Sequence, residues 1–544
     1  MTRSTHIRRG AGVLAFAMGA SLFAAAGPGQ AAPTTRESAV APAASAAQGD
    51  QVQAPIPALN WQRCPDLPKT YQCATAKAPL DYDNPSGPTV LLDLLKVAAT
   101  KPSQKLGTLF VNPGGPGGSS RGFAMMAGDI LGTTVKTRYD VIGIDPRGVG
   151  PHTEMVCRTD APVPPYSPLS FPDSIAASKV VWRQAEWART ACTKNPAAIV
   201  RHMSTADTAR DMDLIRQAVG DQKLYYYGVS YGTYLGATYA SMYPGRVGRL
   251  VVDGVLDPVA WATGDSLPAT QPFSTRLRSA KGAAEAMVSG MRECDRLGKR
   301  SCAFAGGAYA KWLKLVDLAK AGKLTANGEV IPYPNLIGGV LGFLYGHTYS
   351  GLDVILQQLW DENVAKSGRV ASDAASRLAQ SATAIADAPY QAPQARTSTV
   401  RDAFSGVACS DTRNPENRAD WWRAGVAQDK QYPWFGSLWT WASATCAKWP
   451  IVTKSDSYFG PFGGPTANPI LVVGNTYDPA TPIHGARKVA SLFEKSRLLT
   501  YDGWGHGALG NSCVTAAFDR YYATGALPAV GATCTMDAPL FSAS

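Results

Sequence analysis

A serine between two glycines is the part of this sequence best suited to catalysis. The stretch Gly228-Val229-Ser230-Tyr231-Gly232 follows a short apolar run, 223–227, and precedes a helix-like run that ends at Pro244-Gly245. A strand, a sharp turn and a helix in this order form a nucleophile elbow, in which the glycines allow close backbone packing and the serine hydroxyl stands exposed at the sheet edge. This context predicts that Ser230 is a catalytic nucleophile.

A serine hydroxyl is a poor nucleophile near neutral pH and needs a base that a third group holds in the right orientation. The sequence offers His506 in a glycine-rich turn, 502–507, directly after the strand-like run 497–501. Asp478 follows an earlier strand-like run, 469–474, so its carboxylate is predicted to reach the imidazole. The order serine, acid, histidine is the order found in α/β hydrolases.

Two of these residues also have simpler explanations. An Asp-Pro pair is common in turns, so Asp478 could serve a chain reversal as well as the triad. His506 could be a structural residue of its loop. Thr481 is predicted to support the carboxylate or to cap the following helix, and His484, which opens that helix, is predicted to be a capping or surface residue.

Acyl transfer also needs hydrogen-bond donors aimed at the oxyanion that develops on the substrate. The backbone N–H of Tyr231, next to the nucleophile, is one predicted donor. A glycine- and proline-rich run, 113–118, follows the apolar run 107–111. Gly115 in this run is the predicted second donor, because a residue without a side chain lets its amide approach the substrate closely. Arg147, after the next strand, is predicted to support this loop through hydrogen bonds.

The elements that position these residues alternate between strands and helices. Apolar, β-rich runs predict strands at 89–97, 107–111, 139–144, 223–227, 249–253, 469–474 and 497–501, and helical spacing predicts helices at 208–219 and 483–494. Such alternation predicts an α/β fold, with a mostly parallel sheet covered by helices on both faces. Between 261 and 465 the alternation lapses and helical patterns such as 281–292 and 370–386 dominate. This stretch is predicted to be a cap over the carboxyl edge of the sheet.

The sequence predicts five segments. They are a signal peptide at 1–31, a flexible leader or pro-segment at 32–55, a first core segment at 56–260, the helical cap at 261–465 and a C-terminal core segment at 466–544. The first segment joins a basic start, an apolar run and a small-residue cleavage site, which favours secretion. A membrane anchor is the alternative, but the apolar run is short and rich in Ala and Gly. No later stretch is long and apolar enough to predict a membrane span.

Composition narrows the function classes. Of the 544 residues, 45% are hydrophobic and 17% are charged, which is the balance of a globular protein. The net charge is +11, and it becomes +8 when the three arginines of residues 1–31 are removed, since 11 − 3 = 8. This charge is spread thinly, without the basic and aromatic clusters of a nucleic-acid site. The predicted chemistry needs no metal and no organic cofactor.

The ten cysteines fall into five pairs of neighbours along the chain. In an exported protein an even number of cysteines suggests disulfides, and local pairing is the simplest choice. Zinc binding is the alternative, but no CxxC pair or histidine cluster accompanies the cysteines. The predicted pairs are Cys64–Cys73, Cys157–Cys192, Cys294–Cys302, Cys409–Cys446 and Cys513–Cys534.

These motifs resemble those of the secreted bacterial tripeptidyl aminopeptidases, which are α/β hydrolases related to proline iminopeptidases. The resemblance covers most of the chain from Trp61 onward. It rests on the segments 112–119, 145–150, 228–236, 446–450, 478–482 and 505–506. It implies that Ser230 is the nucleophile, Asp478 the orienting acid and His506 the base. It also implies release of short peptides from the free amino terminus of peptides and proteins. Proline iminopeptidases typically carry His where this chain has Asn112.

An aminopeptidase needs a buried carboxylate to hold the ammonium group of its substrate. Asp411, in the predicted cap, is predicted to supply it. A secreted carboxylesterase with the same triad would need no such group, and a binding protein on an inactive hydrolase fold would need no triad. The presence of all three triad residues favours an enzyme, while the choice between a peptide and an ester substrate stays open.

Overall fold

The structure is a computed structural model, and it describes residues 54–194, 197–264, 270–366, 376–381, 399–449 and 456–542. The predicted signal peptide, the leader up to residue 53 and most of the predicted helix 370–386 lie outside these ranges. Within them, no helix combines the length and the apolar character needed to cross a bilayer.

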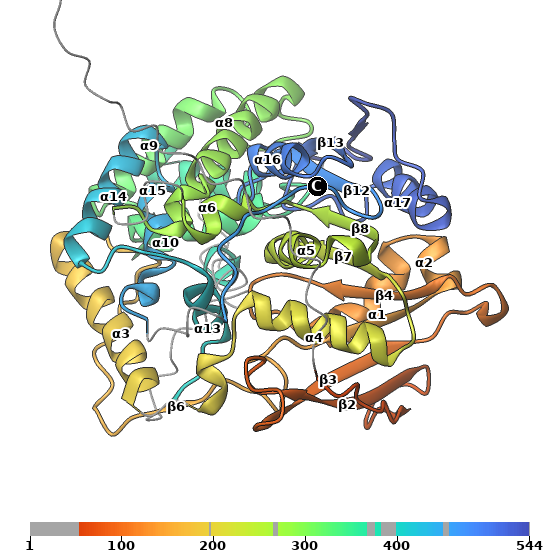
Figure 1. Ribbon diagram of the computed structural model, residues 1–544. Helices are drawn as coiled ribbons and strands as arrows, with labels where there is room; N and C mark the ends of the chain where they lie inside the picture. The colour runs from red at the N-terminus through yellow and green to blue at the C-terminus, as the bar shows by residue number, and fades with distance from the viewer. Residues whose placement is uncertain are drawn as a thin grey trace, which may run out of the picture. The chain divides into compact units, whose positions relative to one another are not determined.

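A ten-stranded sheet forms the centre of the fold (Figure 1). Its strands are β1 (Gln62–Arg63), β2 (Tyr71–Pro79), β3 (Thr89–Val97), β4 (Gly107–Asn112), β5 (Tyr139–Ile144), β7 (Leu224–Val229), β8 (Val247–Asp253), β12 (Ile470–Tyr477), β13 (Ser496–Trp504) and β14 (Thr533–Thr535). They lie in the order β1-β2-β3-β5-β4-β7-β8-β12-β13-β14. The pairings from β1 to β5 are antiparallel, and those from β5 to β14 are parallel. The predicted mostly parallel sheet is confirmed.

Helices cover both faces of the sheet. One layer consists of α4 (Thr205–Ala218), α5 (Tyr231–Met242) and α16 (His484–Leu492), and the other of α1 (Ser120–Ile130), α2 (Thr133–Arg138) and α17 (Ser512–Thr524). Successive strand residues point to opposite faces, so each buried strand contributes to both layers. In β12, Ile470 and Val472 pack with the first layer, whereas Leu471 and Val473 pack with the second.

The chain between β8 and β12 forms a mainly helical insertion. Its elements are α6 (Pro258–Ala262), α7 (Phe273–Arg276), α8 (Ser279–Leu297), α9 (Ala308–Lys320), β9 (Thr325–Ala326), β10 (Glu329–Val330), α10 (Tyr333–Leu344), α11 (Leu352–Trp360), the π-helical turn η4 (Asp361–Ala365), β11 (Thr399–Val400), α13 (Ala403–Asp411), α14 (Arg418–Gln431), α15 (Gly436–Trp441) and the 3-10 turn η5 (Ala444–Cys446). Helices α8 to α11 share an apolar core in which Trp312, Leu336 and Leu356 are fully buried. Other 3-10 turns are η1 (Pro102–Gln104), η2 (Ala198–Arg201) and η3 (Pro244–Arg246). The four helices α8 to α11 therefore pack around a core distinct from the two sheet layers.

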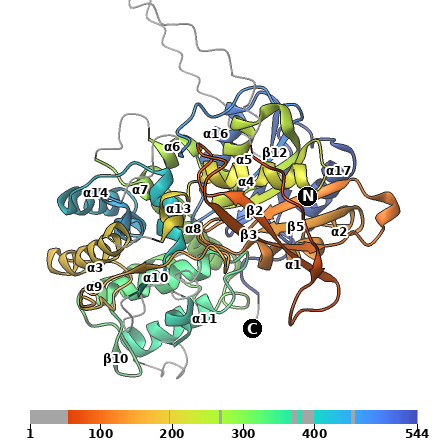
Figure 2. The same cartoon turned by 60° about the horizontal axis from the view of Figure 1, so that its bottom comes forward.

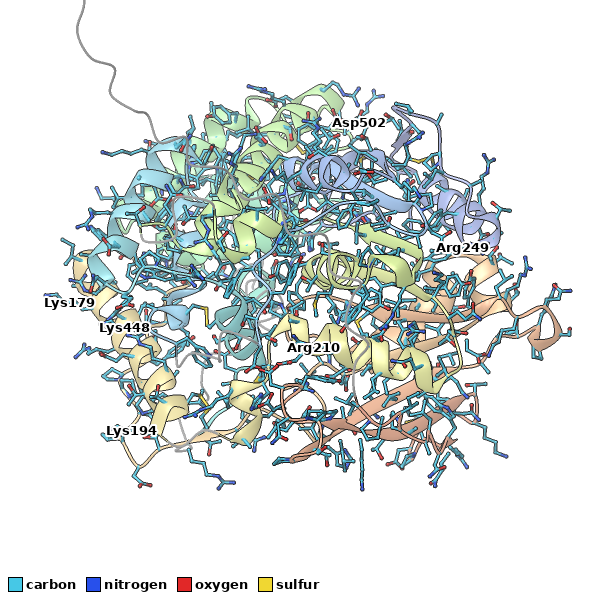
Figure 3. All side chains as sticks on the ribbon, viewed as in Figure 1. Lys179, Lys194, Arg210, Arg249, Lys448 and Asp502 are labelled. Carbon is cyan, nitrogen blue, oxygen red and sulfur yellow. A yellow bond between two sulfur atoms is a disulfide. The ribbon has the colours of Figure 1, made fainter. Side chains whose placement is uncertain are left out.

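One helix of the predicted first core segment, 56–260, lies outside the two sheet layers. This helix, α3 (Ile175–Lys194), packs against α14 and η5 of the insertion, and Figure 2 shows it beside α14, away from α1 and α2. The strand before it, β6 (Cys157–Arg158), pairs with β11. Lys179 and Lys194 on α3 are exposed (Figure 3). The predicted boundary at residue 260 assigns α3 to the first core segment, although α3 packs against the insertion, because a helical pattern does not specify the layer on which the helix packs.

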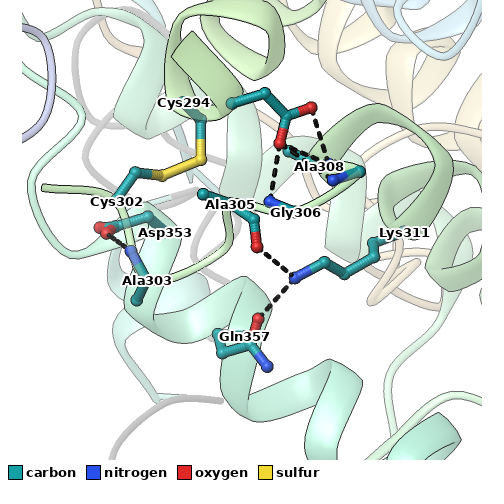
Figure 4. Close-up of a disulfide and its surroundings, with 11 residues drawn as sticks. Cys294, Cys302, Ala303, Ala305, Gly306, Ala308, Lys311, Asp353 and Gln357 are labelled. Atoms are coloured by element: carbon teal, nitrogen blue, oxygen red, sulfur yellow. Dashed lines mark hydrogen bonds between the residues drawn. A yellow bond between two sulfur atoms is a disulfide. The ribbon is translucent and has the colours of Figure 1, made fainter. Parts of the chain in front are cut away.

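All ten cysteines form the five predicted disulfides. The two cysteines of each bridge are 8 to 37 residues apart in the sequence. Figure 4 shows Cys294–Cys302, which closes the turn after α8, next to the Ala303 amide that donates to Asp353 of α11 at 2.8 Å. Each bridge therefore closes a loop within one part of the chain.

Candidate active site

Ser230 lies at the turn between β7 and α5 in a strained backbone conformation. Its φ of 59° and ψ of −126° are values that a residue with a side chain rarely adopts. A Cβ on Gly228 would lie 2.3 Å from the Gly232 carbonyl oxygen, and a Cβ on Gly232 would lie 2.8 Å from the Asn112 carbonyl oxygen. The two glycines are therefore required by close backbone contacts, and the turn has the geometry of a nucleophile elbow.

His506 and Asp478 form a hydrogen-bonded pair. Nδ1 of His506 lies 3.0 Å from Oδ1 and 3.1 Å from Oδ2 of Asp478. The Thr481 hydroxyl donates to Asp478 Oδ2 at 2.9 Å and lies 3.2 Å from His506 Nδ1. The amides of Ala480 and Thr481 both donate to Asp478 Oδ1 at 2.8 Å. The structure thus brings Asp478, Thr481 and His506 together.

Burial and charge oppose each other in this pair. Complete burial by itself would raise the pKa of Asp478, but the charge of His506 and the hydrogen bonds from His506, Thr481 and Ala480 outweigh it and hold this pKa below its ordinary value. Burial would lower the pKa of His506, but Asp478, and after it Asp253, raise this pKa above its ordinary value. The carboxylate therefore stays ionised near neutral pH and strengthens the imidazole as a base.

Asp253, the last residue of β8, connects the elbow with the histidine loop. Its backbone carbonyl accepts the Ser230 amide at 3.0 Å. Its carboxylate accepts the Ala508 amide at 3.0 Å and the Tyr227 hydroxyl at 2.8 Å. Burial raises the pKa of this carboxyl group to about 6 in spite of these hydrogen bonds. One buried residue thus fixes the spacing between the two loops.

The histidine loop also approaches the elbow directly. A Cβ on Gly507 would lie 3.1 Å from Val229 Cγ2, so the residues next to His506 and Ser230 are in contact. Within the described ranges, no hydrogen bond joins the Ser230 hydroxyl to His506. Catalytic hydrogen bonds are often long in a substrate-free enzyme and shorten in the complex.

The insertion reaches the histidine loop at two points. Tyr345 accepts the His506 amide on its carbonyl at 3.0 Å, and its ring lies edge-on to the imidazole with centroids 5.0 Å apart. His347 Nε2 lies 2.8 Å from the Gly507 carbonyl oxygen. Because a carbonyl only accepts, this nitrogen is the protonated one. The position of the histidine loop therefore depends on the insertion as well as on the sheet.

Three residues that hold the histidine loop are absent from the predicted site. They are Asp253, His347 and Asn475, whose amide nitrogen donates to the Gly505 carbonyl at 2.8 Å. Asp253 ends the predicted strand 249–253, and its position as a carboxylate at a strand end could have identified it as a site residue. His347 offers no comparable signal, because its partner Gly507 is 160 residues further along the chain.

The glycine-rich loop after β4 packs against the elbow. A Cβ on Gly114 would lie 2.5 Å from the Val229 carbonyl oxygen and 3.0 Å from the Tyr231 nitrogen. The Gly114 amide is engaged, since it donates to Asn112 Oδ1 at 2.9 Å. In the part of the chain that the structure describes, the amides of Gly115 and Tyr231 have no protein acceptor. These two amides could therefore donate to an oxyanion.

Arg147 does not support the glycine-rich loop, so the predicted partners are wrong. It is fully buried and bonds both oxygens of Asp211, at 2.8 and 2.9 Å. Its other bonds go to the carbonyls of Pro79 at 2.7 Å, Leu80 at 2.6 Å and His202 at 3.3 Å. The side chain points toward α4 and the loop after β2, and it joins these two elements.

Asp411 is not placed to bind an ammonium group. Its side chain is 1% exposed, and its two oxygens accept the Thr205 amide at 2.8 Å and the Thr205 hydroxyl at 2.6 Å. Thr205 is the first residue of α4, where the amides lack partners within the helix. Burial raises the pKa of Asp411 to about 7. The carboxylate holds α4 against α13, which corrects the prediction that it contacts substrate.

An α/β hydrolase fold with a strained serine at a strand–helix turn and a buried Asp–His pair at two later strand ends defines a serine hydrolase. The chain matches the family model described as alpha/beta hydrolase fold over residues 107–280, and the one described as TAP-like protein over residues 432–534. It is 31% identical over 494 residues to the tripeptidyl aminopeptidase of Streptomyces lividans, which covers 88% of this chain and 86% of the relative. The chain therefore belongs to the tripeptidyl aminopeptidase family and is a serine peptidase.

Two further relatives come from Mycobacterium tuberculosis. Carboxylesterase B is 30% identical over 515 residues, covering 89% of this chain and 92% of the relative. Serine protease Hip1 is 28% identical over 503 residues, covering 88% of this chain and 91% of the relative. One of these relatives is named as an esterase and the other as a protease.

Proposed function

We propose that this peptidase is a secreted exopeptidase that releases tripeptides from the free amino terminus of peptides and proteins. Ser230 is the nucleophile, His506 the general base and Asp478 the acid that orients it. The amides of Tyr231 and Gly115 form the oxyanion hole. The observation that carries the proposal is the buried Asp478–His506 pair on a loop that contacts the strained turn at Ser230.

The reaction proceeds through an acyl-enzyme. Nε2 of His506 takes the Ser230 proton as the hydroxyl oxygen attacks the scissile carbonyl, and the oxyanion accepts hydrogen bonds from the two amides. The C–N bond then breaks, and His506 gives its proton to the leaving amine. A water molecule, deprotonated by the same imidazole, cleaves the Ser230 ester and releases the peptide. Asp478 stays ionised throughout, since its pKa is held below its ordinary value.

Two observations support an exopeptidase acting outside the cell. The insertion contacts the histidine loop through Tyr345 and His347, so it lies where it can limit the length of a bound chain. The five disulfides suit an oxidising compartment, and the start of the chain has the pattern of an export signal.

The experiment compares three substrates: an unblocked tripeptide anilide, the same anilide with an acetylated amine, and a simple aryl ester. We expect the unblocked anilide to be cleaved much faster than the blocked one. The variant Ser230→Ala should lower kcat by about 10⁴- to 10⁶-fold. Equal rates on the blocked and unblocked anilides would contradict the aminopeptidase proposal, and full activity of Ser230→Ala would contradict the mechanism.

A secreted carboxylesterase is the second candidate function. The relative named carboxylesterase B, at 30% identity over most of both chains, favours it. It would use the same triad but would not recognise an amine. Rapid cleavage of the aryl ester beside slow cleavage of both anilides would favour ester substrates instead.

A further inference from the structure

Three metal-ligating side chains converge outside the triad, where the insertion meets the core. Asp81 follows β2, His202 follows η2, and Asp456 lies in the last part of the insertion, before β12. One ligand atom from each of these residues lies within 4.8 Å of the others. We propose that Asp81, His202 and Asp456 bind one divalent transition-metal ion, with Zn²⁺ as the preferred ion.

The imidazole of His202 is the observation that points to a ligand. Its Nδ1 is buried and, within the described ranges, has no hydrogen-bond partner, which is unfavourable for a buried polar atom. Oδ2 of Asp456 lies 3.7 Å from this nitrogen, which is too far for a hydrogen bond. With metal–ligand bonds of about 2.1 Å, two ligands of a tetrahedral zinc lie roughly 3.4 Å apart. A small movement of the side chains would therefore place one ion between them.

The backbone around the three residues is already held in place. Nη1 of Arg147 donates to the Leu80 carbonyl at 2.6 Å and to the His202 carbonyl at 3.3 Å, so one buried side chain links the loops that carry Asp81 and His202. The Ser204 hydroxyl donates to the carbonyl of Asp456. Hydrogen bonds therefore already hold the backbone at His202, at Asp456 and next to Asp81, which favours affinity.

The charges around the cluster also favour a cation. Two carboxylates and a neutral imidazole present a formal charge of about −2, which matches a divalent ion. The neighbouring Arg147 is neutralised by its two bonds to Asp211. Arg210 on α4 (Figure 3) bonds Asp207 at 3.0 Å. Both arginines thus have carboxylate partners, and neither opposes the ion as an unpaired charge.

The donor set selects the type of ion. Imidazole together with carboxylate suits zinc and its neighbours in the first transition row, whereas Ca²⁺ and Mg²⁺ prefer sites made of oxygen alone. Three protein ligands leave a coordination position for water. All ten cysteines are in disulfides, so no thiolate competes for the ion. A bound ion would join two core loops to the last part of the insertion, and it would brace that junction.

Titration calorimetry tests the site. The full chain, purified through a tag without histidine and treated with a chelator, is titrated with ZnCl₂ above the ordinary pKa of histidine. We expect one Zn²⁺ per chain and a higher thermal midpoint in its presence. The variants His202→Gln and Asp456→Asn should each weaken binding by about 10-fold or more and lose the thermal shift. CaCl₂ should produce neither effect.

His152→Gln is the matched control, because His152 Nδ1 also faces a carboxylate, Asp93, at 2.6 Å but lies outside the cluster. It should bind zinc as the wild type does. If His202→Gln fails to fold by circular dichroism, Asp81→Asn replaces it. Absence of stoichiometric binding to the wild type, or unchanged binding to folded ligand variants, would overturn the proposal. Zinc bound by the catalytic His506 would leave binding to the folded ligand variants unchanged, and it would therefore overturn the proposal.

Discussion

Replacing Asp478 by Asn tests the electrostatics of the proposed triad. The carboxylate accepts hydrogen bonds from His506 Nδ1, from the amides of Ala480, Thr481 and Gly507, and from the Thr481 hydroxyl. An Asn side chain has only one acceptor oxygen. Its NH₂ group would take the place of the second carboxylate oxygen and would face the N–H or O–H groups that donate to that oxygen. Loss of the charge-assisted bond to histidine is expected to cost about 1.5–3 kcal/mol.

The rate should fall by more than this bond accounts for. Without the carboxylate, His506 is no longer held with Nδ1 protonated, so Nε2 is not reliably free to accept the serine proton. We expect kcat/KM to fall by about 10³- to 10⁴-fold, which corresponds to about 4–5.5 kcal/mol at 1.36 kcal/mol per factor of ten.

The pH dependence of Asp478→Asn gives a prediction of definite sign. Only neutral His506 can act as the base, so the rate rises as pH increases through its pKa. In the wild type, burial lowers this pKa but Asp478 raises it above the ordinary 6.5. In the variant the effect of burial remains without that of Asp478. The inflection in kcat/KM should therefore move to lower pH, and an inflection that stays in place or rises would refute the reasoning.

Asp502→Asn is the matched control for this variant. Asp502 lies on the strand that leads to His506, is exposed (Figure 3) and bonds the Thr476 hydroxyl at 3.0 Å. It should change neither the rate nor the inflection. Initial rates on an unblocked tripeptide anilide from about pH 5 to pH 8, where histidine titrates, measure both quantities.

Substitutions at three further positions test the packing and a buried titratable group around the site. Gly228→Ala places a Cβ 2.3 Å from the Gly232 carbonyl oxygen and should lower the free energy of unfolding by at least about 1–3 kcal/mol in urea titrations. His347→Leu removes the donor to Gly507 and should lower kcat about 3- to 10-fold with KM unchanged, whereas His347→Gln retains a donor and most of the activity. Burial lowers the pKa of His484 from 6.5 to about 4. Between these two pH values the unfolded chain binds more protons than the folded chain, so the free energy of unfolding falls as the pH decreases from 6.5 to about 4. His484→Gln should lack this loss, of up to about 3 kcal/mol, in unfolding titrations at pH 4 and 7.

The main parts of the fold and site could be predicted because they follow short-range patterns. Parallel strands end at one edge of a sheet, so residues that directly follow apolar runs are brought together there. Ser230, Asp478 and His506 each follow such a run. The disulfides pair neighbours along the chain, which made their connectivity the simplest choice.

Other features depend on which distant elements pack together. The guanidinium of Arg147 reaches Asp211 on α4 rather than the glycine-rich loop, because a long side chain at a strand end can turn toward either neighbour. Asp411 looked available for substrate but satisfies Thr205 at the start of α4. The loop after β4 approaches the elbow through Gly114, and only the bond to Asn112 reveals that this amide is engaged.

The spacing of the disulfides has a consequence for how the chain oxidises. Each cysteine finds its partner at most 37 residues away, and no bridge links a core segment to the insertion. Closing a short loop costs less chain entropy than closing a long one. Under the proposed export, each pair can oxidise soon after both thiols emerge, and the four pairs that precede β12 can do so before β8 and β12 meet. Correct pairing of ten thiols thus depends on proximity along the chain, and the insertion stays free to dock onto the sheet afterwards.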